Sequence, residues 1–213
     1  MKILLVAATQ AEIEPFLSRF SITAGPLEMA IGKHLVKVLI TGVGMVPTAF
    51  SMGKHLSGSS YDLALNAGIA GSFDFSLALG EVCIVTEDVF SELGAEEGEE
   101  FLAFESLGFD GSIQQAMPDP RFPIPASIKK VKALTVNKVH GNELSIAKAI
   151  ARFNPQIESM EGASFFYACK QTGIACIQIR AISNYVERRN VEKWNIPLAI
   201  KNLNDTIIEL LET

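Results

Sequence analysis

The sequence predicts a three-layer α/β/α fold with a central mixed, mostly parallel sheet. Three observations indicate this class: apolar runs of strand length alternate with amphipathic runs of helical length, glycine-containing turns separate them, and no repeat interrupts the order. Such alternation favours parallel strands, whose two faces are then covered by helices. The 213 residues can bury a substantial core, so we expect one domain over residues 1–213.

The first half of the chain supplies the elements that this class needs. The apolar run over residues 3–8 predicts a first strand that begins at residue 2, and residues 11–20 carry a helical apolar stripe. A hairpin-like pair of strands is expected over residues 27–31 and 35–41. The other elements expected here are a helix that ends near Leu56 and strands over residues 62–69 and 81–89.

The second half begins with a segment of different character, residues 91–125, which is rich in glutamate and proline. A lid, a subunit contact and a solvated loop all fit this composition, and the solvated loop is favoured because charge runs usually face water. The elements expected after it are a strand over residues 131–136, helices over 143–152 and 165–171, a strand over 174–179 and a closing helix over 194–211.

The overall composition excludes several classes of function. The formal net charge is −6, whereas a nucleic-acid partner normally requires a basic face. No apolar run approaches the roughly 20 residues that span a bilayer. Polar residues follow the apolar start at once, so we expect a first strand instead of a signal peptide, no membrane partner and a cytoplasmic location. The three cysteines lack metal-ligand spacing and are expected in the core, so no metal is predicted.

Two glutamates stand at the starts of predicted helices. Glu12 follows the first strand, and Glu161 precedes two small residues, Gly162 and Ala163. The helix dipole favours acids at such positions, and for Glu12 taken alone this explanation is preferred. A carboxylate at the ligand-binding edge of an α/β sheet can also take a proton from water or accept hydrogen bonds from a diol. Both roles therefore stay open.

Two glycine-containing segments also follow predicted strands. Gly42 and Gly44 suggest a dinucleotide fingerprint, but Pro47 replaces the third glycine, so a tight turn with its amides towards a ligand is the better interpretation. Residues 66–72 are mostly small and permit close approach of a flat or polar ligand. A crowded turn without function explains this second segment equally well.

Taken in order, five phrases of the sequence resemble the nucleoside phosphorylase/hydrolase superfamily, and most closely its bacterial 5′-substituted nucleosidases. They are residues 1–12, 41–44, 66–71, 159–163 and 180–184. Within the superfamily the chain is similar to the futalosine hydrolase family, which splits a hypoxanthine nucleoside in the alternative menaquinone pathway. The resemblance implies a small-molecule partner, a purine nucleoside with a 5′ substituent, no cofactor, and a homodimer or larger homo-oligomer.

The resemblance also implies a role for each site residue. Glu12 would orient or deprotonate the attacking water and Asn184 would assist the departing base, so these are the expected catalytic residues. The expected substrate-binding residues are Met160 and Glu161 at the ribose, Ala70 and Gly71 beside the sugar and base, Val139 and His140 in the purine pocket, and Ser183.

Asn184 distinguishes between purine bases. The resemblance implies that adenine-releasing nucleosidases carry Asp at the matching position, which this chain does not. An asparagine side chain can donate to O6 of hypoxanthine and accept from its N7–H as the base leaves. Hypoxanthine is therefore the expected base, with a plain turn or cap residue as the alternative for Asn184.

The segment after the first strand favours water over phosphate as the nucleophile. Superfamily phosphorylases bring glycines and an arginine there, whereas residues 8–12 of this chain are Ala-Thr-Gln-Ala-Glu, and a carboxylate repels phosphate. One departure from the related nucleosidases is Ile69, where they often have Ser. The alternatives are a methylthioadenosine/S-adenosylhomocysteine nucleosidase, a 6-oxopurine nucleoside phosphorylase and a non-enzymatic nucleoside-binding protein.

The 5′ substituent of futalosine carries a benzoate, for which the sequence offers basic candidates. They are Arg188, Arg189 and Lys193, just after Asn184, and Arg121 from a neighbouring subunit.

Overall fold

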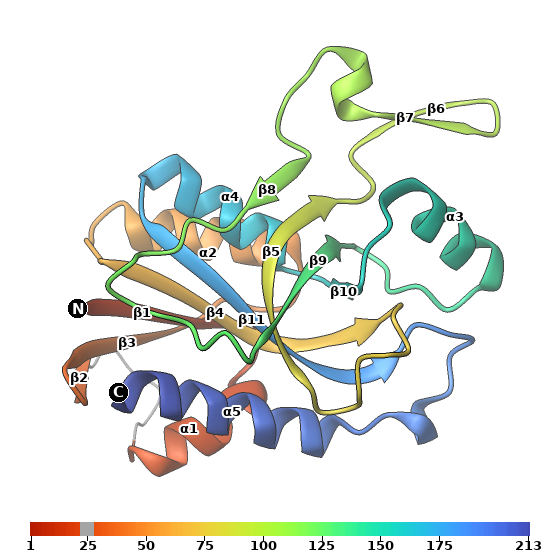
Figure 1. Ribbon diagram of the computed structural model, residues 1–213. Coiled ribbons are helices and arrows are strands. Elements are labelled where there is room, and N and C mark those ends of the chain that lie inside the picture. The colour runs from red at the N-terminus through yellow and green to blue at the C-terminus, as the bar shows by residue number, and fades with distance from the viewer. Residues whose placement is uncertain (22–27) are drawn as a thin grey trace.

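The computed structural model describes residues 1–21 and 28–213, and its centre is a nine-stranded mixed sheet (Figure 1). Along the main path the strand order is β10-β9-β5-β11-β4-β1-β3-β2, and β8 pairs with β5. The first strands are β1 (Lys2–Ala7), β2 (Glu28–Ile31), β3 (His34–Ile40), β4 (Leu63–Ser72) and β5 (Val82–Phe90). The later ones are β8 (Ile113–Gln115), β9 (Lys129–Thr135), β10 (Ile157–Ser159) and β11 (Ala175–Tyr185).

The centre of the sheet is parallel. Strands β3, β1, β4 and β11 run in one direction, and so do β5, β9 and β10 among themselves, but β5 is antiparallel to β11. The end of β4 also pairs with β10, which curls this part of the sheet back on itself. The prediction of a mixed sheet with helices on its outside is confirmed.

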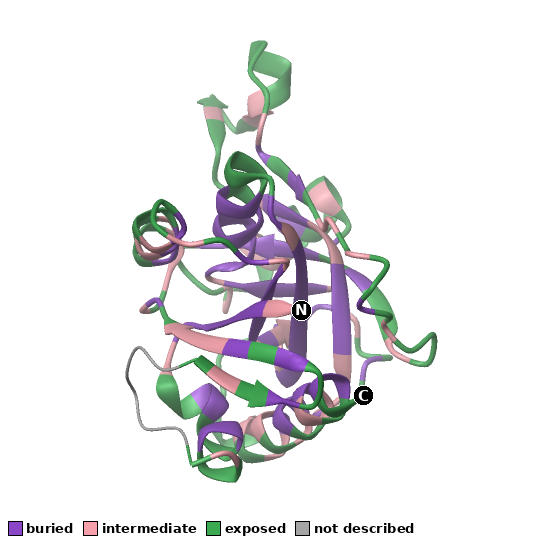
Figure 2. Cartoon of the chain, turned by 90° about the vertical axis from the view of Figure 1, so that its left-hand side faces the viewer, coloured by how far each residue is buried: buried purple, intermediate pink, exposed green. Residues whose placement is uncertain are grey.

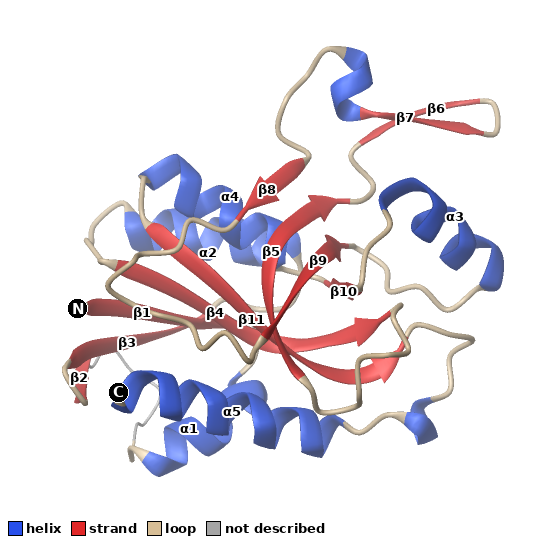
Figure 3. Ribbon diagram, in the orientation of Figure 1, coloured by secondary structure: helices blue, strands red, loops and turns tan. Residues whose placement is uncertain are grey.

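Helices cover both faces of the sheet (Figure 3). One layer contains α2 (Met45–Leu56) and α4 (Gly162–Thr172), and the opposite layer contains α1 (Glu14–Arg19) and α5 (Ile196–Glu212). The helix α3 (Glu143–Phe153) lies at one end of the sheet. Two apolar clusters fill the spaces between these layers, which explains why the central strands are buried along most of their length (Figure 2).

The part of segment 91–125 that precedes β8 projects from the body, whereas the chain after β8 runs back along the sheet and buries Phe122 in the core (Figure 1). The segment is more ordered than the favoured prediction of a solvated loop. It contains a two-stranded hairpin, a 3₁₀ turn and a strand that joins the main sheet: β6 (Gly94–Glu97), β7 (Glu100–Ala103), η2 (Phe104–Leu107) and β8. The expected exposure of its acidic residues holds, since Glu96, Glu97, Glu99 and Glu100 face solvent. That loop prediction is therefore wrong because cross-strand pairing overrides the polar composition.

Other boundaries shift in ways that affect the site. Strands β4 and β11 run on to Ser72 and Tyr185, so the small residues and Asn184 lie within strand ends instead of following them. The helix expected over residues 11–20 divides into a 3₁₀ turn, η1 (Gln10–Ile13), and α1. The predicted start of the hairpin at Leu27 lies outside the described residues. Among the helices of the described ranges, none has the length and apolar character needed to cross a membrane.

Candidate active site

A cavity of about 330 Å³ opens where β1, β4 and β11 end, the edge at which parallel sheets bind ligands. A smaller space of about 50 Å³ adjoins it and shares five of its lining residues. All nine predicted site residues line one or both: Glu12, Ala70, Gly71, Val139, His140, Met160, Glu161, Ser183 and Asn184. We call the side with Glu12 and Glu161 the carboxylate end, and the side with His140 and Asn184 the amide end.

Glu12 is held in place by three donors. Its Oε2 accepts from the backbone N–H and the hydroxyl of Thr9, each at 3.0 Å, and its Oε1 accepts from the backbone N–H of Ile69 at 3.2 Å. Thr9 and Glu12 form a reciprocal capping box at the start of η1. The carboxylate is thus buried, aligned and in contact with the cavity. The backbone N–H of Ile69 is thus engaged with Glu12.

Glu161 lies across the carboxylate end, at the N-cap of α4. Its Oε1 accepts from the backbone N–H of Gly44 at 3.0 Å, so the turn at residues 42–44 faces a carboxylate. Burial raises the pKa of Glu161, and the charge of Glu12 acts in the same direction, whereas Arg180 and the Gly44 N–H oppose the shift. The two carboxylates therefore interact electrostatically within one cavity.

Arg180 lies beneath these carboxylates and is 1% exposed. Its Nη2 is 3.8 Å from Glu161 and donates to Asn66 at 2.6 Å. Gly68 has no side chain because any Cβ there would collide with the Arg180 guanidinium and lie 2.9 Å from Glu12 Oε1. The buried arginine stabilises the negative charge of Glu161, which helps the fold to tolerate this carboxylate.

Asn184 marks the amide end of the cavity. Its Oδ1 accepts from the Ser183 hydroxyl at 2.7 Å, and its Nδ2 donates to the Tyr185 carbonyl at 3.1 Å. Ser183 also donates to the carbonyl of Ala70 at 3.1 Å, which ties β11 to β4. A Cβ at residue 71 would lie 3.2 Å from Asn184 Nδ2, so Gly71 lets the amide lie against the strand.

His140 lies beside Asn184 and is bound to Glu158, a residue that the sequence motifs did not indicate. Glu158 Oε1 accepts from the His140 backbone N–H at 2.9 Å, and its Oε2 lies 2.5 Å from His140 Nδ1. Val139 and Trp194 line the same space. Glu158 belongs to the three-residue strand β10, which is too short for a periodicity in the sequence to reveal it.

Comparisons with known proteins show the family of this chain. The family model described as the phosphorylase superfamily matches residues 2–212. The chain belongs to the phosphorylase superfamily. Futalosine hydrolase of Streptomyces coelicolor is 30% identical over 81% of this chain and 77% of that protein. Futalosine hydrolase of Thermus thermophilus is 28% identical over 81% and 80% of the two chains. The resemblance predicted from the sequence is thereby confirmed.

A solved structure shows the same fold. S-adenosylhomocysteine nucleosidase of Streptococcus pyogenes, in complex with 5-methylthiotubericidin, superposes with a TM-score of 0.81 at 20% identity and covers 100% of this chain and 96% of that one. At this identity the likeness concerns the superfamily fold alone.

Four basic residues were expected near a 5′ carboxylate, and their place at such a substituent stays a prediction. Arg189 stacks on Trp194, with its guanidinium 4.8 Å from the ring centroid, at the amide end. Lys193 pairs with Glu187 at 2.9 Å. Arg121 binds Asp119 and Asp62 before the start of β4, at the opposite edge of the sheet. Arg188 lines a separate surface hollow with residues 141–144. Within one subunit, none of these four reaches the carboxylate end.

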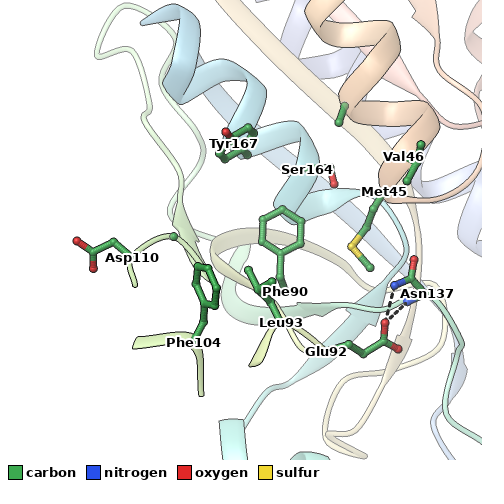
Figure 4. A pocket seen from close by; sticks show the side chains of 12 residues that line it. Met45, Val46, Phe90, Glu92, Leu93, Phe104, Asp110, Asn137, Ser164 and Tyr167 are labelled. Carbon is green, nitrogen blue, oxygen red and sulfur yellow. Dashed lines mark hydrogen bonds between the residues drawn. The ribbon is translucent and has the colours of Figure 1, made fainter. Parts of the chain in front are cut away.

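A larger cavity of about 530 Å³ separates α2 and α4 from the projecting part of segment 91–125 (Figure 4). Its walls are mainly apolar and include Met45, Val46, Phe90, Phe104 and Tyr167. A hydrogen bond of 2.6 Å from the Asn137 amide to Glu92 closes one side. Met45 directly follows Gly44, whose N–H contacts Glu161, so this apolar cavity lies next to the carboxylate end.

Proposed function

We propose that this superfamily member hydrolyses the N-glycosidic bond of futalosine and releases hypoxanthine, as a cytoplasmic enzyme of the alternative menaquinone pathway. The observation that carries the proposal is an amide, Asn184, at one end of a cavity whose other end holds two buried carboxylates, Glu12 and Glu161. The names of the two futalosine hydrolase relatives support it.

The carboxylate end suits cleavage of a bond to a sugar. As the base departs with its bonding electrons, positive charge develops on the sugar ring, and a negative Glu161 beside the ribose favours that charge. Glu161 and the backbone at Met160 would accept hydrogen bonds from the ribose hydroxyls. Glu12, aligned by Thr9 and Ile69, takes a proton from the water that attacks the anomeric carbon.

The amide end suits a departing 6-oxopurine. Hypoxanthine presents an acceptor at O6 and, as it leaves, a donor at N7–H, and the two halves of Asn184 match them. In the structure Asn184 bonds to Ser183 and to the Tyr185 carbonyl, so its orientation is fixed by the strand that carries it. Ala70 and Gly71 form the floor beneath base and sugar, and Val139 and His140 form a wall.

The test is a substrate panel. The protein is incubated with futalosine, inosine and methylthioadenosine, with and without phosphate, and the free base is identified by chromatography. We expect hypoxanthine from futalosine at a rate that phosphate does not change. Release of adenine from methylthioadenosine at a rate similar to that of hypoxanthine release would instead establish an adenine-releasing nucleosidase. Strict phosphate dependence of turnover would establish a phosphorylase. Tight binding of a nucleoside without turnover would indicate a binding protein.

The pH dependence of catalysis follows from the shifted pKa of Glu161. Because burial raises this pKa above the ordinary value of 4.5, Glu161 becomes protonated and neutral at a higher pH than a solvated glutamate. We expect kcat/KM to fall on acidification with an apparent pKa above 4.5. A profile of kcat/KM against pH checks this, and activity that persists unchanged below pH 4.5 would show that the ionised Glu161 is not required.

The apolar cavity between the projecting segment and helices α2 and α4 would accommodate part of a second copy of the chain, as the expected homo-oligomer requires. Val46 there is 76% exposed, although it is apolar. We expect that Val46→Glu prevents dimer formation, so that size-exclusion chromatography with light scattering gives the mass of a monomer where the wild-type protein gives that of a dimer. Leu144 on α3 is equally exposed, at 76%, but lies outside this cavity, so Leu144→Glu is the matched control. An unchanged mass for Val46→Glu would exclude this surface.

A further inference from the structure

Glu158 is a buried carboxylate in the cavity that the mechanism above does not use. It is 3% exposed and lines both the site cavity and the adjoining space. Its two oxygens already accept one hydrogen bond each from His140. A carboxylate oxygen has two lone pairs, so each can accept another hydrogen bond from a ligand. A buried carboxylate with free lone pairs therefore favours a ligand that presents a hydrogen-bond donor to it.

Gly71 brings Glu158 close to Asn184. Glu158 is the register partner of Gly71 where β10 pairs antiparallel with β4. A Cβ built on residue 71 would lie 3.2 Å from Asn184 Nδ2 and 3.7 Å from Glu158 Cγ. The amide and the carboxylate therefore flank the same small patch of β4, and a planar base that meets one has the other beside its edge.

The two groups together match one purine and oppose another. Hypoxanthine carries the O6 acceptor next to the N1–H donor, whereas adenine carries an N1 acceptor next to its amino group. A carboxylate only accepts, so it pairs with N1–H of hypoxanthine and repels the N1 lone pair of adenine. We propose that Glu158 accepts the hydrogen bond from N1–H of hypoxanthine and is, with Asn184, a specificity determinant of the site. This inference rests on the proposed function, because it concerns the same base in the same cavity.

The test measures binding of free bases to the full chain by calorimetry. Wild-type protein is expected to bind hypoxanthine at least about tenfold more tightly than 1-methylhypoxanthine, in which N1 carries no hydrogen. Glu158→Ala should remove this discrimination. Glu158→Gln, whose amide can donate to N1 of adenine, should lower the preference for hypoxanthine over adenine at least about tenfold. Glu81→Gln is the matched control, since Glu81 also accepts from a backbone N–H but lies outside both spaces.

A purely structural role of Glu158 gives a different result. If Glu158 only holds the segment of His140, its variants weaken both bases equally and leave the hypoxanthine-to-adenine ratio at the wild-type value, which would overturn the inference. Equal affinity of the wild-type protein for hypoxanthine and 1-methylhypoxanthine would overturn it as well, even where a variant does not fold. Turnover of futalosine by the same wild-type preparation is measured separately, so failure of the proposed function is seen independently of base recognition.

Discussion

Glu12→Gln is expected to reduce hydrolysis of futalosine by at least about 10³-fold while the substrate still binds. The reason is that general-base catalysis contributes on the order of 10²–10⁴ to such reactions, and a glutamine cannot take the proton from water. Glutamine has nearly the same size and keeps one oxygen that can still accept from Thr9, while its NH2 loses the bond from the Ile69 N–H, so binding is measured directly. Single-turnover rates and calorimetric binding of futalosine separate the two effects.

The matched control for this variant is Glu14→Gln. Glu14 is exposed and, within residues 1–21 and 28–213, its side chain accepts from Gln10 and Ser18. Its loss should therefore leave kcat within about twofold of wild type, as for most surface substitutions. Wild-type activity in Glu12→Gln would remove Glu12 from the mechanism.

Asn184→Asp is expected to shift the base preference from 6-oxopurines towards 6-aminopurines. The substitution removes the only donor of this side chain, so O6 of hypoxanthine faces a negative oxygen, whereas the amino group of adenine gains an acceptor. Mismatches of this kind in a buried site can change discrimination by up to about 10⁴-fold, and we expect at least about 10²-fold here. The ratio of kcat/KM for inosine and adenosine measures the shift.

Asn202→Asp controls for the loss of structure. Asn202 donates to the carbonyl of Gly80 at 2.8 Å, much as Asn184 donates to that of Tyr185 at 3.1 Å, but it lies outside the cavity. We expect Asn202→Asp to keep the wild-type base preference. An unchanged preference in Asn184→Asp would show that the amide does not select the base.

Much of the fold was predictable because strand and helix periods are local properties of the sequence. Strong apolar runs such as residues 3–8 became central strands, and Gly173 ends α4 in the left-handed conformation expected of a stop signal. Boundaries were less predictable. The strands β4 and β11 continue through small and polar residues because each pairs with the other up to Tyr185, and pairing partners are not visible in one segment.

The nine predicted site residues could be named from the sequence because the order of the five phrases indicated the superfamily, and the resemblance then implied a position for each; their roles stay predictions. Three other residues that line the cavity, Thr9, Glu158 and Ser159, were not predicted as site residues. Thr9 had a local signal, the capping box with Glu12 three residues later. Glu158 had none, since β10 is formed only by pairing with β9 and β4. Ser159 opens the phrase 159–163, but that phrase assigned it no role. In the described part of the chain, the buried Ser159 hydroxyl has no hydrogen-bond partner and lines the cavity.

A crystal structure of the protein with bound hypoxanthine tests the central claim most directly. The proposed chemistry predicts the purine at the amide end, with Asn184 within hydrogen-bond distance of O6 and N7 and the sugar-bearing nitrogen directed towards Glu12 and Glu161. A complex in which the Asn184 amide keeps only its bonds to Ser183 and Tyr185, and the purine lies away from it, would contradict the assignment of this site to a 6-oxopurine nucleoside.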